Sequence, residues 1–167
     1  MSGSGTEEAL QKAAIFAGLA DEARARFAGT LEVQAFDVGR IVITEGDLAR
    51  DLYVVVTGEV EVTKKSKSGR SARIALLGPG DCFGEMAVVD VQPRSASLRT
   101  LAPSRLLRMS AVDLERLRHE DMPSYAQVVM NLARELSRRL RTADGLIADL
   151  VVQVWDSYLT SDTDKKV

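Results

Sequence analysis

The sequence predicts a mainly β domain with flanking helices, and two patterns carry this prediction. From about residue 31 to residue 109, short β-branched segments alternate with glycine-rich turns, a spacing that is typical of a sandwich or barrel. Apolar residues at helical spacing lie before these segments and after them. A chain of 167 residues with 46% hydrophobic content can bury one core of good size. We therefore expect one β domain with a helical appendage.

Residues 7–29 predict two short helices, because their helically spaced apolar positions are interrupted near Gly18. The predicted strands lie within residues 31–43, 52–56, 59–63, 73–77 and 98–109, and turn signals separate them at 45–47, 57–59, 66–69 and 78–81. Ser110 and Asp113 have the spacing of a capping box, so a helix is expected to begin at Ser110. A longer helix is expected after Pro123.

The longer helix carries an apolar stripe that is close to a heptad seam. Its members are Val129, Leu132, Leu136, Leu140, Ala143, Ile147, Leu150 and Val154. Such a stripe can pack against its own domain or pair with the same helix of a second copy. We expect the first half of the stripe to pack against its own domain. The part after Leu140 extends beyond what the β domain can cover, and we expect it to form a homodimer. Gly145 weakens the seam by about 1 kcal/mol relative to alanine and can mark a hinge or a break.

Composition excludes several classes of function. The net charge of −2 and the isoelectric point near 5.5 provide no basic field for nucleic acid. Cys82 is the single cysteine and His119 the single histidine, so neither a disulfide framework nor a multi-cysteine zinc site can form, and no metal site is expected. The single cysteine fits a reducing compartment, so a cytoplasmic location is expected.

The apolar runs are too short for a membrane segment. Leu52–Val56 and Leu146–Val154 are interrupted well before membrane-spanning length, and the N-terminal residues show no secretory signal. We expect no membrane partner. The tails at residues 1–6 and 161–167 are small, polar or charged and are expected to be flexible.

Residues 83–97 combine side chains suited to an anionic phosphodiester. Arg94 offers a planar fork of N–H donors that can bind two phosphate oxygens. A short helical turn is expected around residues 85–87, and its free amides would point at the same anion. Gly84 and Ala87 allow a close approach of the main chain, and Ser95 adds a hydroxyl donor.

Glu85 completes this set, because an ionised carboxylate accepts hydrogen bonds and suits a ribose 2′-hydroxyl. Structural roles are the alternatives. Arg94 could form a surface ion pair with Glu85 or Asp90, and Glu85 could serve as a favourable charge at a helix N-terminus. Cys82 fits a buried small apolar residue better than a redox sensor, and His119 is expected in solvent.

The segments Phe83-Gly84-Glu85-Met86-Ala87 and Pro93-Arg94-Ser95-Ala96-Ser97 resemble the phosphate-binding cassette of the cyclic-nucleotide-binding domain family. This family includes bacterial catabolite-activator regulators, regulatory subunits of protein kinase A and cyclic-nucleotide-gated channels. The glycine-punctuated segments 38–39, 45–47, 52–55, 58–62 and 77–81 resemble its strands in the same order, so that the resemblance covers roughly residues 8–142.

The resemblance implies an eight-stranded, jelly-roll-like β-roll followed by a long C-terminal helix, with ligand entering between the cassette and the helix after Pro123. It also implies that Gly84 and Glu85 contact ribose and that Arg94 contacts phosphate. The ligand would be cAMP or cGMP. The candidate ligand-binding residues are Phe83, Gly84, Glu85, Met86, Ala87, Arg94, Ser95, Ala96 and Arg139.

Two departures concern the purine. In catabolite-activator-like proteins the long helix carries an arginine followed by a Thr-Ser pair that meets the base, whereas here Arg139 leads to Thr142-Ala143-Asp144 and the pair is missing. At Ser95 a hydroxyl residue often accompanies cGMP in the family, but bacterial cAMP regulators also use serine there. We favour cAMP.

These patterns predict a regulatory or sensor module in which ligand couples the cassette to the C-terminal helix, and no paired base and nucleophile points to an enzyme. The expected parts are a nucleotide-binding domain at 7–142 and a helical extension, possible dimerisation segment, at 143–160. Two alternatives remain. The chain could be a degenerate dimerisation scaffold that binds nothing, or the ligand domain of a transcription regulator without its DNA-binding part, because about two dozen residues follow Arg141.

Overall fold

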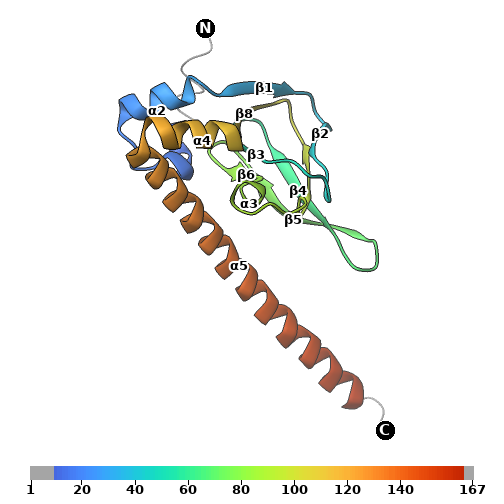
Figure 1. Ribbon diagram of the computed structural model, residues 1–167. Helices are drawn as coiled ribbons and strands as arrows, with labels where there is room; N and C mark the ends of the chain where they lie inside the picture. Colours follow the sequence, from blue (N-terminus) through green and yellow to red (C-terminus); the bar gives the residue numbers. More distant parts are fainter. Residues whose placement is uncertain (1–9, 164–167) are drawn as a thin grey trace. The chain divides into compact units, whose positions relative to one another are not determined.

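Two four-stranded antiparallel sheets form a β-roll in the computed structural model, which describes residues 10–163 and side chains as far as Tyr158. The strands are β1 (Glu32–Phe36), β2 (Ile41–Ile43), β3 (Asp51–Thr57), β4 (Val60–Lys65), β5 (Ser71–Leu77), β6 (Cys82–Phe83), β7 (Ser97–Thr100) and β8 (Ser104–Ser110). One sheet has the order β1-β8-β3-β6 and the other β2-β7-β4-β5 (Figure 1). The predicted eight-stranded, mainly β fold is confirmed. Sequence reasoning had missed β6, because two residues give no periodicity.

The central strand β3 explains how the core is divided. Its apolar residues are all buried, and their side chains alternate between the two faces of the sheet. Leu52 and Val54 join the cluster that faces the helices, whereas Tyr53 and Val55 join the cluster inside the roll. A strand that is buried on both faces reads as a continuous apolar run, as this one does.

Short helical segments cover the outer face of the first sheet (Figure 1). They are a turn at residues 10–12, the 3₁₀ helix η1 (Ala14–Phe16), α2 (Asp21–Ala28) and α4 (Ala111–Glu120). The predicted interruption at Gly18 is confirmed, and this glycine has a φ of +78°. Nδ2 of Asn131, in the first part of α5 (Met122–Thr163), donates to the carbonyls of Ile15 (3.1 Å) and Ala17 (2.7 Å), which ties the N-terminal segment down.

The predicted helix start at Ser110 is confirmed in detail. Ser110 is the N-cap of α4, and its Oγ accepts the N–H of Asp113 at 3.2 Å. The Asp113 carboxylate accepts the N–H of Ser110 at 2.9 Å in return. This reciprocal capping box satisfies two of the amides that every helix start leaves open.

The long helix α5 is continuous through Gly145, so the alternative of a break at this glycine is wrong. The helix begins at Met122, one residue before Pro123, and proline is tolerated there because first-turn amides have no intrahelical acceptor. Val128 and Leu132 are buried in the core, whereas the seam residue Val129 is partly exposed. The chain divides into two compact units, Met1–Leu132 and Ala133–Val167. Of the tails predicted at residues 1–6 and 161–167, residues 161–163 belong to α5, and the rest lie outside the described residues.

Candidate functional site

A tight turn after β6 opens the candidate site. Gly84 follows Phe83 with a φ of +80° and leads through Glu85 into α3 (Met86–Val89). A Cβ on Gly84 would lie 2.7 Å from the carbonyl oxygen of Asp51 and 2.8 Å from Nη1 of Arg94. Only glycine fits this backbone conformation and this space. The sequence predicted that Gly84 allows a close approach of the main chain to a ligand. In the structure, the groups that come close to Gly84 are the Asp51 carbonyl and the Arg94 guanidinium.

Arg94 lies inside the protein, with 6% of its surface exposed. Its Nη1 donates to the carbonyl of Gly84 at 3.0 Å. Burial lowers the pKa of Arg94 from its ordinary value, while the nearby charges of Asp51, Glu85 and Asp47 oppose this shift. The alternative of a surface ion pair is wrong, because the guanidinium is not at the surface. A buried arginine that is held by a carbonyl keeps further N–H donors for an anion.

Glu85 is also buried, with 3% of its surface exposed. It is the N-cap residue of α3, and its carbonyl accepts the amides of Val88 (3.1 Å) and Val89 (3.2 Å). In the part of the chain that the structure describes, Oε2 of Glu85 makes no hydrogen bond, although the residue has other polar interactions. Glu85 and Arg94 thus bring opposite charges to one buried region, and the expected helical turn is confirmed one residue later than predicted.

The remaining residues of the cassette fall into a buried group and an exposed pair. Phe83, Ala87 and Ala96 are buried, and the Phe83 ring stacks on Tyr53 with centroids 5.3 Å apart. Met86 and Ser95 are exposed, and the Ser95 hydroxyl donates to the Met86 sulfur at 3.6 Å. The structure therefore brings together the predicted residues of both cassette segments. The buried group packs the site, and the exposed pair lies at its surface.

Arg139 belongs to the second compact unit, which begins at Ala133. Its Nε donates to Oε1 of Glu135 at 3.0 Å, and Arg138 pairs with the second oxygen of the same carboxylate, also at 3.0 Å. These are i,i+4 and i,i+3 pairs along one helix, which is an ordinary arrangement for charged side chains of a helix.

Sequence reasoning missed several groups that surround the cassette. The carbonyl of Asp47 accepts the backbone N–H of Arg94 at 2.9 Å, and the charge of Asp51 acts on the same arginine. Lys64 donates to Glu45 at 2.8 Å and also to the carbonyl of Ser95. All of them come from segments much earlier in the chain, and no local pattern marks such partners. The Glu-Gly-Asp segment 45–47 was predicted as a turn and as part of the family resemblance, but not as a partner of the cassette.

Two minor predictions can be followed in the structure. Cys82 is buried in the core cluster that faces the helices, as expected of a small apolar residue. His119 is exposed on α4, where its Nε2 lies 3.1 Å from Oε1 of Glu115. Among the side chains of residues 10–158, no cluster of histidine, cysteine and acidic residues could hold a metal ion. Over the same residues, no helix has both the length and the apolar content to cross a membrane.

A family model for the cyclic nucleotide-binding domain matches residues 33–121, more than half of the chain, so this chain belongs to that family. The resemblance drawn from the cassette is confirmed. By its own description, the ligand of this family is a cyclic nucleotide.

Individual relatives carry more specific names than the family model. The CRP-like cAMP-activated global transcriptional regulator of Mycobacterium tuberculosis is 33% identical over 147 residues, which are 87% of this chain and 63% of the relative. The cyclic AMP receptor protein of Thermus thermophilus is 35% identical over 78% of this chain and 58% of its own length. The crystal structure of the Thermus thermophilus catabolite activator protein has a TM-score of 0.75 at 34% identity, over 83% of this chain and 63% of that one. This chain spans less than two thirds of each of these proteins.

Proposed function

We propose that this chain binds a cyclic nucleotide, with cAMP preferred to cGMP, and that Arg94 holds the phosphate. The observation that carries the proposal is the buried guanidinium of Arg94 at the Gly84 turn. Removing a positive charge from water is costly, and a bound phosphodiester would offset that cost with paired, charge-assisted hydrogen bonds. Family membership and the names of the cAMP-dependent relatives support this ligand class.

The ribose is assigned to the first cassette segment. Glu85 is buried beside the charge of Arg94, and a carboxylate there would accept the 2′-hydroxyl. Gly84 would contribute its main chain to the site, and the small side chains of Ala87 and Ala96 would leave room for the sugar and phosphate. Phe83 would support these residues of the cassette through the stacking of its ring on Tyr53.

The exposed pair Met86 and Ser95 would face the ligand from the surface side. A hydroxyl can donate to a phosphate oxygen, and a methionine side chain adapts its shape to an apolar purine. Arg139 is the residue of α5 that would contact the bound nucleotide and so couple binding to this helix. The nucleotide-binding domain would then comprise residues 7–142 and the helical extension residues 143–160, and ligand would act by shifting the helix between two arrangements.

We further propose a regulatory role without catalysis, in the cytoplasm. The printed names of the relatives are those of regulators, and the site combines an anion-binding arginine with a ribose acceptor rather than a nucleophile with a base. The M. tuberculosis relative favours one specific second candidate, the ligand-binding part of a transcription regulator. The length of the open reading frame distinguishes a module that acts alone from such a part.

Isothermal titration with cAMP and cGMP tests the proposal. We expect binding of cAMP, and we expect Arg94→Ala to weaken it by at least about 30-fold, because truncating one partner of a buried charge pair costs about 2–5 kcal/mol. Arg40→Ala removes the same charge from an exposed position and should leave the affinity unchanged. Arg94→Lys, which keeps the charge but loses the fork, should lie between the two.

Two outcomes would overturn this assignment. Absence of heat with both nucleotides would identify a degenerate scaffold. If wild type and a folded Arg94→Ala protein bound cAMP with equal affinity, Arg94 would not be the residue that binds the phosphate.

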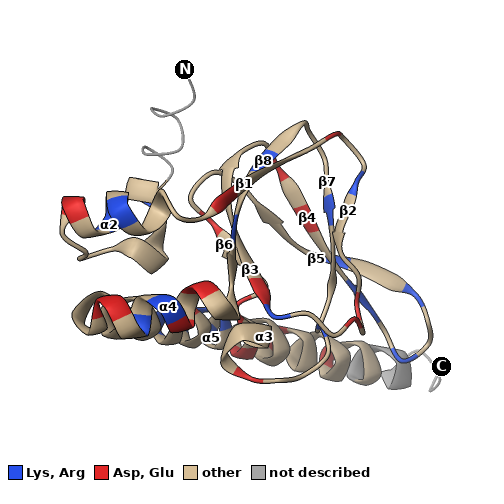
Figure 2. Cartoon of the chain, turned by 45° about the horizontal axis from the view of Figure 1, so that its top comes forward, with Lys and Arg blue, Asp and Glu red and all other residues tan. Residues whose placement is uncertain are grey.

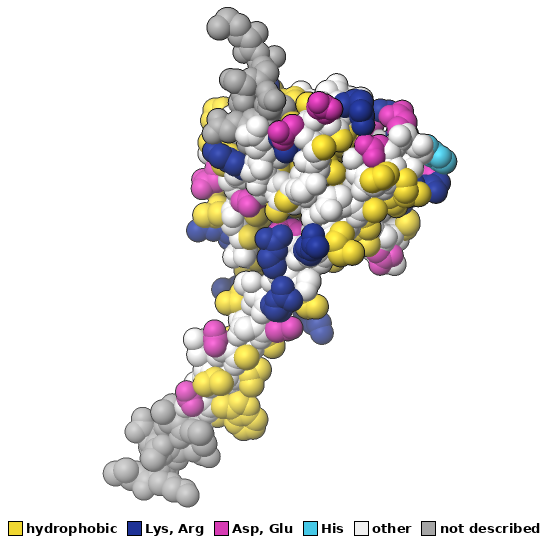
Figure 3. Space-filling view, turned by 90° about the vertical axis from the view of Figure 1, so that its left-hand side faces the viewer, with side chains coloured by type: hydrophobic (Ala, Val, Ile, Leu, Met, Phe, Trp, Pro, Cys, Tyr) yellow, Lys and Arg dark blue, Asp and Glu magenta, His cyan; other side chains and the backbone are white. Residues whose placement is uncertain are grey.

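A homodimer through the C-terminal helix is the second part of the proposal. In the unit that begins at Ala133, apolar side chains are exposed along α5: Leu140, Leu146, Ile147, Leu150, Val151, Val152, Val154, Trp155 and Tyr158. Figure 3 shows hydrophobic side chains gathered on the last described turns of this helix. A stripe this long is unfavourable in water and fits an identical stripe, because a heptad seam is complementary to itself.

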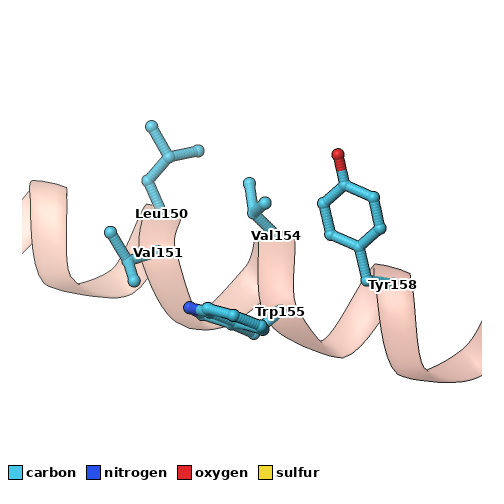
Figure 4. Close-up of a pocket in the computed structure, with 5 residues that line it drawn as sticks. All are labelled: Leu150, Val151, Val154, Trp155 and Tyr158. Atoms are coloured by element: carbon cyan, nitrogen blue, oxygen red, sulfur yellow. The ribbon is translucent and has the colours of Figure 1, made fainter.

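The last turns give this face its shape. Leu150, Val154 and Tyr158 point to the same side of the helix, and Val151 and Trp155 form the adjacent row (Figure 4). Together these five residues line an apolar groove. Val151, Trp155 and Tyr158 were not members of the predicted seam, so the apolar face is broader than a strict heptad.

A further inference from the structure

We propose that Lys64 and Glu45 form a clamp that positions the phosphate-binding residues 94–97 by holding the carbonyl of Ser95. The clamp is a positioning device, and it rests on the proposed function only for its effect on nucleotide affinity. Nothing in residues 83–97 themselves points to it, because both of its members come from other parts of the β-roll.

The turn after β2 binds residues 94–97 at three points. The N–H of Arg94 donates to the carbonyl of Asp47 at 2.9 Å, and the N–H of Gly46 donates to the carbonyl of Arg94 at 2.9 Å. The N–H of Glu45 donates to Oγ of Ser97, also at 2.9 Å. These bonds skip the carbonyl of Ser95.

Lys64 supplies the missing bond from a different direction. It lies near the end of β4, a strand that pairs with β7 through Thr63 and Ser97. Its Nζ donates to the carbonyl of Ser95 and to Oε1 of Glu45, the latter at 2.8 Å.

Glu45 is itself held in place. Its second carboxylate oxygen accepts the backbone N–H of Lys65 at 3.0 Å. The ammonium therefore lies between an acceptor in the cassette and a counterion that the end of β4 fixes.

The geometry of the peptide bond gives this contact its meaning. A trans peptide is planar, so that its C=O and its N–H point in opposite directions. Gly46 fixes the plane before Ser95 through the Arg94 carbonyl, and Lys64 fixes the plane after it through the Ser95 carbonyl. Both backbone dihedrals of Ser95 are then set, and with them the directions of its Cα–Cβ bond and of the Ser95 and Ala96 amides.

Without Lys64, the peptide plane after Ser95 would be free to rotate in the nucleotide-free protein. Nucleotide binding would then have to order this plane, at a cost in affinity. The ordering of one backbone residue corresponds to a factor of roughly 5 to 30 in an equilibrium constant. We therefore expect Lys64→Met to weaken cAMP binding by a factor in this range.

Lys65 offers a matched control. It is the next residue on β4, is exposed, and contributes its backbone N–H rather than its side chain to the clamp. It belongs to the same group of basic residues on the β4–β5 hairpin (Figure 2). Lys65→Met removes the same charge from the same region, so both variants lose equal long-range attraction for an anionic nucleotide.

The experiment titrates cAMP into wild type, Lys64→Met, Lys65→Met and Lys64→Arg. The proposal expects weak binding for Lys64→Met, wild-type affinity for Lys65→Met and partial recovery for Lys64→Arg, which keeps N–H donors at this position. Thermal unfolding of the nucleotide-free proteins should be nearly unchanged, because an exposed ion pair adds little stability. Equal affinities of Lys64→Met and Lys65→Met would overturn the clamp, whether both are weakened or neither is.

Hydrogen exchange of the nucleotide-free protein separates this proposal from the proposed function. We expect faster exchange of the amides in residues 94–97 for Lys64→Met than for Lys65→Met, with or without any capacity to bind nucleotide. If wild type bound neither cAMP nor cGMP, the proposed function would fall, and this exchange difference would still decide for or against the clamp. Identical exchange in the two variants contradicts it.

Discussion

The two compact units of this chain place their side chains in opposite ways. The unit with the β-roll buries the charged residues Arg94 and Glu85, as well as Glu61. The helical unit exposes apolar residues such as Leu150 and Trp155. Each arrangement is unfavourable in an isolated protein in water. Buried charge calls for a small polar ligand, whereas exposed apolar surface calls for a macromolecular partner, and the same chain shows both.

The comparison also teaches how each site is specified. The buried pair depends on a backbone that only glycine allows at position 84, and thus on a fixed arrangement of distant segments. The apolar face depends on periodicity along a single helix and needs no other segment to form. A single substitution should therefore damage the first site through folding and the second only through assembly.

The largest effect is expected at the turn. Gly84→Ala should lower the free energy of unfolding by about 3 kcal/mol or more, because a Cβ meets the Asp51 carbonyl oxygen at 2.7 Å and the φ is positive. Gly39→Ala is the matched control, since Gly39 has a φ of +77° but nothing within 4 Å of the place that a Cβ would take, and should cost about 1–2 kcal/mol. Urea unfolding measures both. Equal losses would show that crowding at residue 84 contributes nothing.

The helical face should be sensitive in assembly and insensitive in folding. Val154→Glu should weaken a dimer by about 3 kcal/mol, roughly 100-fold, because two valines per dimer lose their apolar burial. Val112→Glu places the same charge at an exposed position of α4 and should have no effect. Light scattering over a range of concentrations measures the association. A wild-type mass equal to that of a monomer at every concentration would exclude the dimer.

A smaller effect is expected at the ribose acceptor. Glu85→Ala should weaken cAMP binding by about 1–3 kcal/mol, the cost of leaving a buried hydroxyl without its acceptor. Asp90→Ala removes an exposed carboxylate at the end of α3 and serves as the control. Titration with 2′-deoxy-cAMP gives an independent measure. If the deoxy analogue bound wild type as tightly as cAMP does, Glu85 would not be the ribose acceptor.

The smallest effect concerns pH and the clamp. The hydrogen bond from Lys64 and that from the backbone of Lys65 lower the pKa of Glu45 below its ordinary value. A carboxyl group with a lowered pKa in the folded state stabilises the protein above its unfolded pKa, and this contribution is lost as pH falls through the folded pKa. Thermal unfolding between pH 6 and pH 3 should show a slightly shallower acid dependence for Glu45→Gln than for wild type. Coincident curves would show that the Glu45 charge does not contribute.

Much of the fold could be predicted locally. The turns at 45–47, 57–59, 66–69 and 78–81 separate the observed strands, and the capping box at Ser110 begins α4. The positions of the strands other than β6, and of the short helix of the cassette, were also predicted to within a few residues. These features depend on interactions between neighbours in the chain, which the sequence displays directly.

The state of the site residues could not be predicted in this way. The sequence left Arg94 open between a buried anion ligand and a surface ion pair, and its 6% exposure excludes the second. Gly145 was open between a seam position and a break, and α5 continues through it. Burial depends on which segments pack together, and helix continuity on the balance of a whole helix, so a single residue reveals neither.

The sequence by itself determined the kinds of groups that this protein has available: an arginine, a glutamate and small residues within one short segment, and an apolar stripe on one helix. Only the tertiary structure decided which of these groups are buried and which distant residues hold them, as Lys64 and Glu45 hold Ser95. The physical reason is range. Backbone preferences act over a few neighbouring residues, whereas burial and hydrogen bonds between strands arise only when segments far apart in the chain come together.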